Sequence, residues 1–239
     1  NLPRGYAQIY LNSPLRQQQV DAAVMLVLWS DLYGLEQTAL INEASIAGMG
    51  LSLGLDEGLR LSISGFTDKQ PTLIATALSA LRIDPSAQSL EQAVDRFVRG
   101  LENRKRELPF RQLGSTLSSL TRTGFYDEAS LLDAVAKVTP ERFNAFVETV
   151  LETALVRVYL FGNYDAPFAE SLAATLRSAL PAKRSAATAY ARERVYSPVP
   201  GQTLVKNTDL PVEDLGVMLL YAAPEASVAN EAIGRVLAR

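Results

Sequence analysis

The sequence predicts an α+β fold: an antiparallel sheet with helices packed on one face, followed by the start of a second module. Residues 5–13 alternate, with Ala7, Ile9 and Leu11 on one side, as in a strand with one buried face. Two apolar runs on either side of a turn at 56–58 have the pattern of a hairpin. In the longer segments between and after these strands, apolar residues recur at helical spacing.

The first part of the chain is predicted to contain two helices between the opening strand and the hairpin. Helical spacing covers residues 16–33, and Gly34 is expected to interrupt it. A second helix is predicted from about Leu35 to Ala47, where the glycines at 48 and 50 provide a C-terminal end. The hairpin strands are Leu51 to Leu55 and Leu59 to Ile63.

Helices are predicted to dominate residues 65–180. Pro71 lies in the first turn of a helix that runs to about Leu81. Ser89 and Gln92 form a capping box that opens a helix to about Glu107. Pro109 breaks this pattern, and Thr139-Pro140 opens a later helix. The remaining predicted elements are helices at Phe110–Leu120, 127–138, 140–153 and Phe168–Leu180, and a strand at Leu155–Phe161.

The stretch 182–201 differs in composition from the residues before it. It holds prolines and cations and few large apolar residues, so we expect a surface linker between modules. Residues 1–181 would then form the first module, and 202–239 the start of a second, homologous one. In that second module we expect strands near 203–207 and 215–222, and a helix from about Glu225. The strand–proline–helix order of residues 9–14 recurs at 219–224, which supports a repeated module.

Composition excludes several classes of function. The chain has 239 residues with no histidine and no cysteine, so it cannot form a Ser-His-Asp triad, a Cys-His pair or an imidazole-based zinc site. Phosphate-binding, nucleophile-elbow and calcium-loop motifs are lacking. A net charge of −3 argues against nucleic acid, because phosphate binding needs a basic face. No apolar run approaches the roughly 18 residues of a membrane span.

Three segments are candidates for a site, and each has a plain structural alternative. Asp68-Lys69 is either a substrate-contacting loop or, as we favour, the start of a helix after a strain-relieving Gly65. Asp56-Glu57 is either part of a metal site or, as we favour, a solvated turn, because adjacent residues at a strand end point in opposite directions.

The third candidate is the densest basic cluster, residues 104–106 with Arg99 and Arg111. It either lines a chamber that attracts acidic peptides or forms a solvated helix face. Glu102 and Glu107 interleave it, which favours the solvated face. We therefore assign no catalytic, cofactor-binding or metal-ligating residue in this chain, and we expect no cofactor.

Residues 44–51 and 58–70, with the Gly-Phe-x-Asp-Lys exit from the hairpin, resemble the third domain of the pitrilysin/insulysin (insulinase-like) zinc metallopeptidase family. The tail from Gln202 looks like the beginning of that family's fourth domain. The resemblance implies four homologous modules in two half-shells around a chamber, with zinc held by an H-x-x-E-H motif in the first module only. The Arg and Tyr that the fourth domain supplies fall beyond Arg239, so no site residue is carried over.

The resemblance leads to two hypotheses. The favoured one is a non-catalytic segment from the C-terminal half of a zinc metalloendopeptidase that hydrolyses peptides in an enclosed chamber, forming chamber wall and half-shell contacts. The alternative is a catalytically dead interaction subunit of the same fold that partners an active zinc peptidase subunit. An unrelated α+β binding module is a third, weaker reading. On the favoured reading zinc belongs to the first domain of the parent protein, and this chain should be inactive alone.

The expected partners follow from these hypotheses. They are the N-terminal half of the same polypeptide or a homologous subunit, and peptide substrates, with no nucleic acid and no membrane. Residues 202–239 are also expected to self-associate, because the strand near 215–222 is apolar on both faces. The chain begins at Asn1 without an initiator methionine, so we expect a fragment of a longer protein, and its compartment, periplasm or cytoplasm, stays undetermined.

Overall fold

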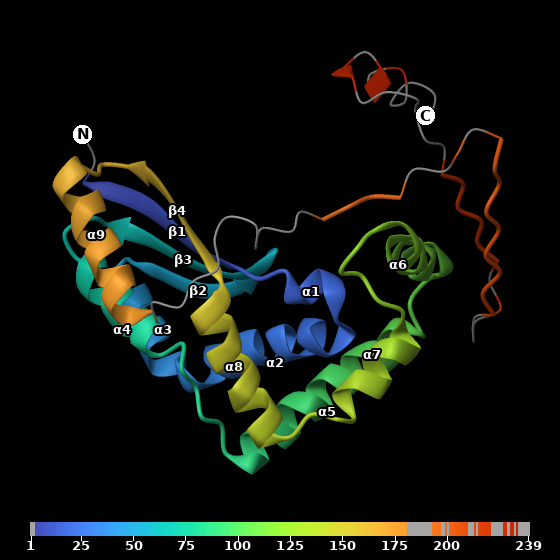
Figure 1. The fold of residues 1–239 in the computed structure, drawn as a ribbon, viewed down its shortest axis with the longest axis horizontal. Helices are drawn as coiled ribbons and strands as arrows, with labels where there is room; N and C mark the ends of the chain where they lie inside the picture. The colour runs from blue at the N-terminus through green and yellow to red at the C-terminus, as the bar shows by residue number, and fades with distance from the viewer. Residues whose placement is uncertain are drawn as a thin grey trace.

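The computed structural model describes residues 3–180, together with 193–196, 199, 201–209, 213, 215–220, 227, 228, 230, 231 and 233. Strands and helices within residues 3–180 form an α+β fold, with helices against one face of a sheet (Figure 1). The fold class predicted from the sequence is therefore confirmed. Among the described residues, no helix is long and apolar enough to cross a membrane.

The sheet has four antiparallel strands in the order β2-β3-β1-β4. The first strand of the sequence lies inside the sheet, between the hairpin and the distant fourth strand. Ala7, Ile9 and Leu11 of this strand are fully buried against the helices, as their alternation predicts. The strands are β1 (Arg4–Asn12), β2 (Gly50–Leu55), β3 (Gly58–Phe66) and β4 (Leu155–Gly162).

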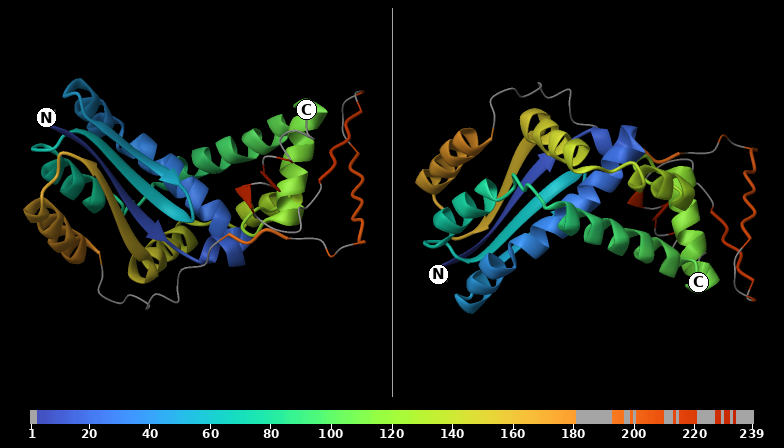
Figure 2. Two further views of the ribbon diagram at one scale, coloured as in Figure 1. Left: turned by 90° about the horizontal axis from the view of Figure 1, so that it is seen from above. Right: turned by 90° about the horizontal axis from the view of Figure 1, so that it is seen from below.

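The helices fall into two groups (Figures 1 and 2). One group, α2, α3, α4, α8 and α9, lies beside the sheet, whereas α5, α6 and α7 extend away from it. The helices predicted after the hairpin are confirmed, with ends shifted by a few residues. Their bounds are α1 (Leu15–Gln18), α2 (Val20–Glu36), α3 (Thr38–Ile46), α4 (Gln70–Ser79), α5 (Ala87–Arg104), α6 (Pro109–Thr121), α7 (Glu128–Val135), α8 (Pro140–Thr153) and α9 (Ala166–Ala179).

The core is built around α2, which is buried on most of its circumference. Trp29 lies in the core, as its helical setting predicts: its ring is fully buried, its Nε1 donates to Leu81 O at 3.0 Å, and it meets Phe146 edge-on. Tyr33 is also fully buried, and its hydroxyl donates to Ala77 O at 3.2 Å. Both polar tips therefore find a main-chain acceptor, which is what makes their burial favourable.

Two predicted boundaries of the early helices are wrong. The segment 16–33 is divided, because Gln19 adopts an extended conformation between α1 and α2. Gly34 does not end a helix, and α2 continues through it to Glu36. The burial of Leu32 and Tyr33 just before the glycine holds the last turn in place, so tertiary packing overrides the weak helical preference of Gly34.

The capping box predicted at Ser89 is wrong as well. The helix begins one turn earlier, and Ser86 is its N-cap, with its hydroxyl oxygen accepting from Ser89 N at 3.1 Å. Ser86 and Ser89 are separated by three residues, which is the spacing of an N-cap and the main-chain donor it accepts from. The N-cap is therefore a serine, as predicted, but it is Ser86 and not Ser89. The helix ends at Arg104, before the predicted Glu107. The caps at Asp127, Thr139 and Asp165 each accept from the main chain of the first turn.

The tail differs from its prediction in its strands. No strand forms at the described residues of 203–207 and 215–220, and these residues are exposed. A strand exists only when a neighbour pairs with its main chain, and the described part of this chain supplies none there. In the predicted helix, the described residues 228, 230, 231 and 233 are in helical conformation, and Glu231 N donates to Ser227 O at 2.9 Å. Most of the predicted linker, and residues 221–226, lie outside the described residues.

Candidate functional site: the open face of the sheet

The face of the sheet opposite the helices is lined by polar and aromatic side chains. The register aligns Tyr6 with Ser64 and Phe161, and Gln8 with Ser62 and Tyr159. The next row aligns Tyr10 with Arg60 and Arg157. Side chains two residues apart on a strand share one face, so these rows form one continuous surface. Phe161 is 67% exposed and Tyr159 52%, so this surface has no cover within the described residues.

The side chains of β1 on this face are linked to one another. Tyr10 Oη donates to Gln8 Oε1 at 2.6 Å, and Gln8 Nε2 donates to Tyr6 Oη at 2.8 Å. The Arg157 guanidinium lies 5.5 Å from the centre of the Tyr10 ring, a cation–π distance. The arrangement holds amides, hydroxyls and ring faces at the surface, groups that bind peptide backbone and side chains without covalent chemistry.

One end of this face carries a small charged cluster. Asn12 is buried, and it accepts from Arg157 Nε at 2.9 Å while its Nδ2 donates to Glu57 Oε2 at 3.3 Å. Arg157 Nη2 also lies 3.5 Å from Glu57 Oε2. A shallow hollow of about 570 Å³ lies beside this cluster, lined by Gln8, Tyr10, Asp56, Glu57, Arg157, Val158 and Tyr159.

Asp56 and Glu57, the pair weighed as a metal site, lie at the tip of the hairpin, and each forms an ion pair with an arginine. Asp56 pairs with Arg60 at 3.6 Å, and its main-chain oxygen accepts from Arg16. Glu57 faces Arg157. Among the residues that the structure describes, no group of three acidic side chains gathers as a metal ion would require. The preference for a turn at this position is consistent with this geometry.

Asp68-Lys69, the candidate for a substrate-contacting loop, precedes α4. The two side chains are mostly exposed and lie 3.8 Å apart, and Lys69 is the residue that precedes the helix. Gly65 has a φ of 118°, a conformation that side-chain-bearing residues rarely adopt, so its expected role in relieving strain is confirmed. Both residues lie beyond the end of β3, outside the aligned rows that form the open face.

The basic cluster is distributed around the end of α5 and the start of α6, far from the open face (Figure 1). Lys105 pairs with Glu128 at 3.2 Å, and Arg111 lies over the ring of Phe110. Arg104, Lys105 and Arg111 also line a hollow of about 490 Å³ between α5, α6 and α7. Glu107, Asp127 and Glu128 line the same hollow, so its charge is mixed, in keeping with the preferred reading of a solvated surface.

The structure also reveals a buried polar network that the sequence analysis missed. Gln70 is completely buried, and its Nε2 donates to Gly5 O at 3.0 Å and Gly65 O at 3.2 Å. Its Oε1 accepts from Tyr164 Oη at 2.6 Å. Burial raises the pKa of the Tyr164 hydroxyl, and the hydrogen bond to Gln70 partly opposes that rise. In the sequence, the one feature that points to this network is Gln70 itself, a glutamine at the start of a helix that follows two strands containing glycine.

The fold and the site define an α+β module: a helix-backed sheet with an open polar face, in a chain without histidine. Residues 1–134 match the family described as the middle or third domain of peptidase M16. Since this match covers more than half of the chain, the chain belongs to that family, which confirms the resemblance to insulinase-like peptidases.

Named relatives agree with this assignment. The chain is 22% identical over 181 residues to the A-factor-processing enzyme of Saccharomyces cerevisiae, which covers 75% of this chain and 18% of that enzyme. The crystal structure of pitrilysin superposes with a TM-score of 0.68 and 21% identity, covering 74% of this chain and 19% of pitrilysin. A peptidase M16 inactive domain from Pseudomonas fluorescens gives a TM-score of 0.61 at 17% identity, covering 78% of this chain and 48% of that one. The chain thus spans about a fifth of the length of its full-length relatives.

Proposed function

We propose that this chain forms part of the wall of an enclosed chamber in which a zinc metalloendopeptidase hydrolyses peptides, and that it contributes contacts between the two half-shells. The observation that carries this proposal is membership of a non-catalytic M16 domain family in a chain that has no histidine. The catalytic zinc must therefore be bound elsewhere, since the inverted zinc motif requires two histidines.

The open face of the sheet supports the proposal that this chain forms a chamber wall in contact with peptide. Its tyrosines, amide and guanidinium offer hydrogen bonds and ring surfaces, and its opposite face is occupied by the core. A peptide in a chamber has to be held loosely enough to move and to leave after cleavage. A surface of polar groups and exposed rings suits that task better than a deep apolar pocket.

The test is reconstitution with the part of the protein that precedes this chain. The chain alone should retain less than one zinc per molecule after dialysis and should cleave no peptide. Added to a separately purified half that contains H-x-x-E-H, it should bind that half and raise its cleavage of a fluorogenic peptide. A stoichiometric zinc in the chain alone, or an N-terminal half that is equally active without it, would refute the proposal.

The alternative of a dead interaction subunit differs in gene organisation. An H-x-x-E-H motif upstream in the same reading frame supports the single-chain peptidase. A full-length product without that motif, co-purifying with a separate zinc subunit, supports the dead subunit. Both outcomes keep the same fold and the same open face, so only this comparison distinguishes them.

We also propose the domain division 1–181, 182–201 and 202–239. Part of the linker is held in place. Thr123 N donates to Arg194 O at 3.0 Å, and Arg194 N donates to the Thr123 hydroxyl oxygen at 2.8 Å. Tyr196 N donates to Thr121 O at 2.6 Å. Trypsin should therefore cut first at Lys183, Arg184 or Arg192, and later at Arg194. First cuts inside β3 or β4, at Arg60 or Arg157, would contradict the division.

The tail is proposed to be covered by a partner. Leu215 is 99% exposed and Val217 86%, and apolar side chains in such a run gain from burial. The cover is either the rest of a fourth domain or a second copy of this tail. Light scattering gives the molar mass of the full chain and of a version that ends near Leu180. If both are monomers, pairing between two copies of the tail is excluded.

A further inference from the structure

Helix α6 presents an apolar stripe that its own module does not cover. The stripe is formed by residues that recur every three or four positions, namely Phe110, Leu113 and Leu117. Pro109, at the start of the helix, is its one buried residue, and Phe110 is 59% exposed. Within the described residues, the hydrophobic core and the side chains packed against it include none from α6. The stripe is therefore available to another part of the protein.

The opposite side of α6 is polar and faces two hollows. One hollow, of about 490 Å³, meets the helix at Gln112, Ser115 and Ser119. The other, of about 420 Å³, meets it at Gly114, Ser115 and Ser118 and separates it from α2, α5 and α7. At about 3.6 residues per turn, these positions lie across the helix from the stripe. A helix that served this module alone would face the other way, with its stripe toward the core.

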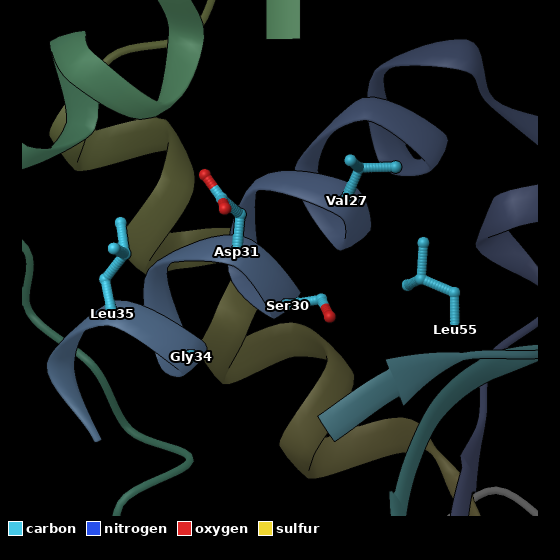
Figure 3. Close-up of a pocket in the computed structure, with 6 residues that line it drawn as sticks. All are labelled: Val27, Ser30, Asp31, Gly34, Leu35 and Leu55. Atoms are coloured by element: carbon cyan, nitrogen blue, oxygen red, sulfur yellow. The ribbon is translucent and has the colours of Figure 1, made fainter. Parts of the chain in front are cut away.

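The hollow on the surface of α2 differs from these two, because the helix beside it is packed (Figure 3). The apolar residues of α2 are buried in the core. Ser30 Oγ donates to Leu53 O at 2.9 Å, and Asp31 Oδ2 accepts from Arg96 Nη2 at 2.7 Å. The volume of this hollow is about 440 Å³, and it is lined by Val27, Ser30, Asp31, Gly34, Leu35 and Leu55. A hollow alone therefore does not indicate a docking surface, and the uncovered stripe is what distinguishes α6.

The tail of the chain approaches the stripe closely at Gly216. A Cβ atom on this residue would lie 2.8 Å from Pro109 Cβ and 2.9 Å from Leu113 Cδ1. Both separations are shorter than ordinary contact between carbon atoms, so glycine lets the main chain lie this close to the helix. Further along, Met218 and Leu220 are less exposed than the odd-numbered residues of the same segment. This is the pattern of an extended segment whose even-numbered side faces α6.

Residues that precede this segment also contact α6 or the loop after it. Lys206 and Asp209 line the hollow of about 490 Å³ beside the helix. Just beyond the C-terminal end of α6, Arg122 forms an antiparallel bridge with Val195, and its Nη2 donates to Glu193 Oε2 at 3.0 Å. The described part of the linker and tail thus follows α6 from its C-terminal end to its N-terminal end. Figures 1 and 2 show the tail at the α6 end of the molecule, away from the sheet.

We propose that the stripe of α6 is the seat of the second module. Residues 215–220 lie along it, with Gly216 at the closest approach, and they hold the second module in a fixed orientation to the first. Burial of apolar side chains from both partners supplies the attraction, and the bridge at Arg122 sets the direction in which the chain leaves the first module. The proposal rests on the domain division given above, and it assigns α6 to the junction between the modules.

Cysteine cross-linking of the full chain tests this placement, because the sequence has no cysteine. In the double variant Pro109→Cys and Gly216→Cys, mild oxidation should form a disulfide within the chain, since a disulfide joins Cβ atoms about 4 Å apart. The matched control combines Pro109→Cys with Val217→Cys, whose side chain leaves the segment on the other face. The control should cross-link at least about tenfold more slowly, because side chains that point apart are not bridged without movement of the main chain.

Single substitutions in the Pro109→Cys and Gly216→Cys variant test the stripe itself. Leu117→Gln removes an apolar side chain from the stripe and should slow cross-linking by at least about threefold, because part of the apolar contact is lost. Ser118→Gln places the same side chain on the side that faces the hollow of about 420 Å³, and it should leave the rate unchanged. If Pro109→Cys disturbs the start of α6, the pair Leu113→Cys and Gly216→Cys repeats the measurement.

Three results would overturn the proposal. They are equal rates for the Gly216 and Val217 pairs, equal rates after Leu117→Gln and Ser118→Gln, and disulfides that form mainly between chains. The last result would show that the stripe takes a second copy of the tail. The measurement needs neither the zinc-bearing half nor a peptide, so its failure is separate from failure of the chamber-wall function. A chain that raises peptide cleavage without cross-linking keeps that function and loses only this junction.

Discussion

The two ends of strand β1 are secured by different chemistry. At its start, the amide of Gln70 is completely buried and joins Gly5, Gly65 and Tyr164 through neutral hydrogen bonds. At its end, Asn12 joins Glu57 and Arg157, whose side chains are partly exposed. The buried end must satisfy every polar group within the protein, whereas water can replace a lost partner at the charged end. The first end is therefore expected to contribute more to stability, and the second is free to serve the surface.

The largest effect is expected from Gln70→Leu. This change leaves the carbonyls of Gly5 and Gly65 and the hydroxyl of Tyr164 with fewer partners in a buried site. The free energy of unfolding, measured by urea titration of the full chain, should fall by about 3–4 kcal/mol, a sum of penalties for unsatisfied buried groups.

Tyr164→Phe is the control for this network, because it removes one hydroxyl and leaves both Gln70 donor bonds in place. Its cost should be nearer about 1 kcal/mol. If Gln70→Leu lowers the free energy of unfolding as little as Tyr164→Phe does, water reaches this end of the sheet. The two ends of β1 would then not differ as described.

A second prediction concerns Tyr33, another buried neutral group on the covered side. Burial raises its pKa from 10.0 to about 12 in the folded chain, so the folded state keeps the proton while the unfolded state releases it. This contribution is fully present below pH 10 and is lost as the pH rises to about 12, reducing the free energy of unfolding by about 2–3 kcal/mol.

The measurement is a series of urea unfolding curves across that pH range. Tyr33→Phe cannot ionise at this position, so its stability should decline less steeply than that of the parent chain. Parallel slopes for the two proteins would show that Tyr33 ionises in the folded state as readily as in the unfolded one.

Asn12→Ala should have an intermediate effect at the charged end. The buried amide is lost, but Glu57 and Arg157 can turn toward water or toward each other. The expected cost is about 1–2 kcal/mol, less than that of Gln70→Leu although both residues are buried amides. If Asn12→Ala and Gln70→Leu lower the free energy of unfolding equally, the two ends of β1 contribute equally to stability.

Glu57→Gln should have the smallest effect. The pair with Arg157 is partly exposed and separated by 3.5 Å, so its removal should cost under about 1 kcal/mol. The difference between the variant and the parent should shrink further at high salt, because ions screen exposed charges. A larger cost that is insensitive to salt would indicate that Glu57 acts through its hydrogen bond to Asn12.

The sequence alone determined the elements that follow a strong local pattern. The alternation in β1, the hairpin and the amphipathic helices after it were all predictable, because each buries one face at a fixed period. The lack of histidine in the sequence excluded an imidazole-based zinc site within it, since that depends on composition and not on geometry. Gly65 was also predictable, because only a residue without Cβ suits its φ of 118°.

Only the tertiary structure decided where these elements meet. It placed β1 between β3 and β4, which are separated in sequence by many residues, and so created the open face. It carried α2 through Gly34, against local preference, because the burial of Leu32 and Tyr33 outweighs one poor helix former. It also joined Gln70 to Tyr164, and it placed Ser30 of α2 against the carbonyl of Leu53 in β2. Such pairings depend on long-range contacts, which no local spacing encodes.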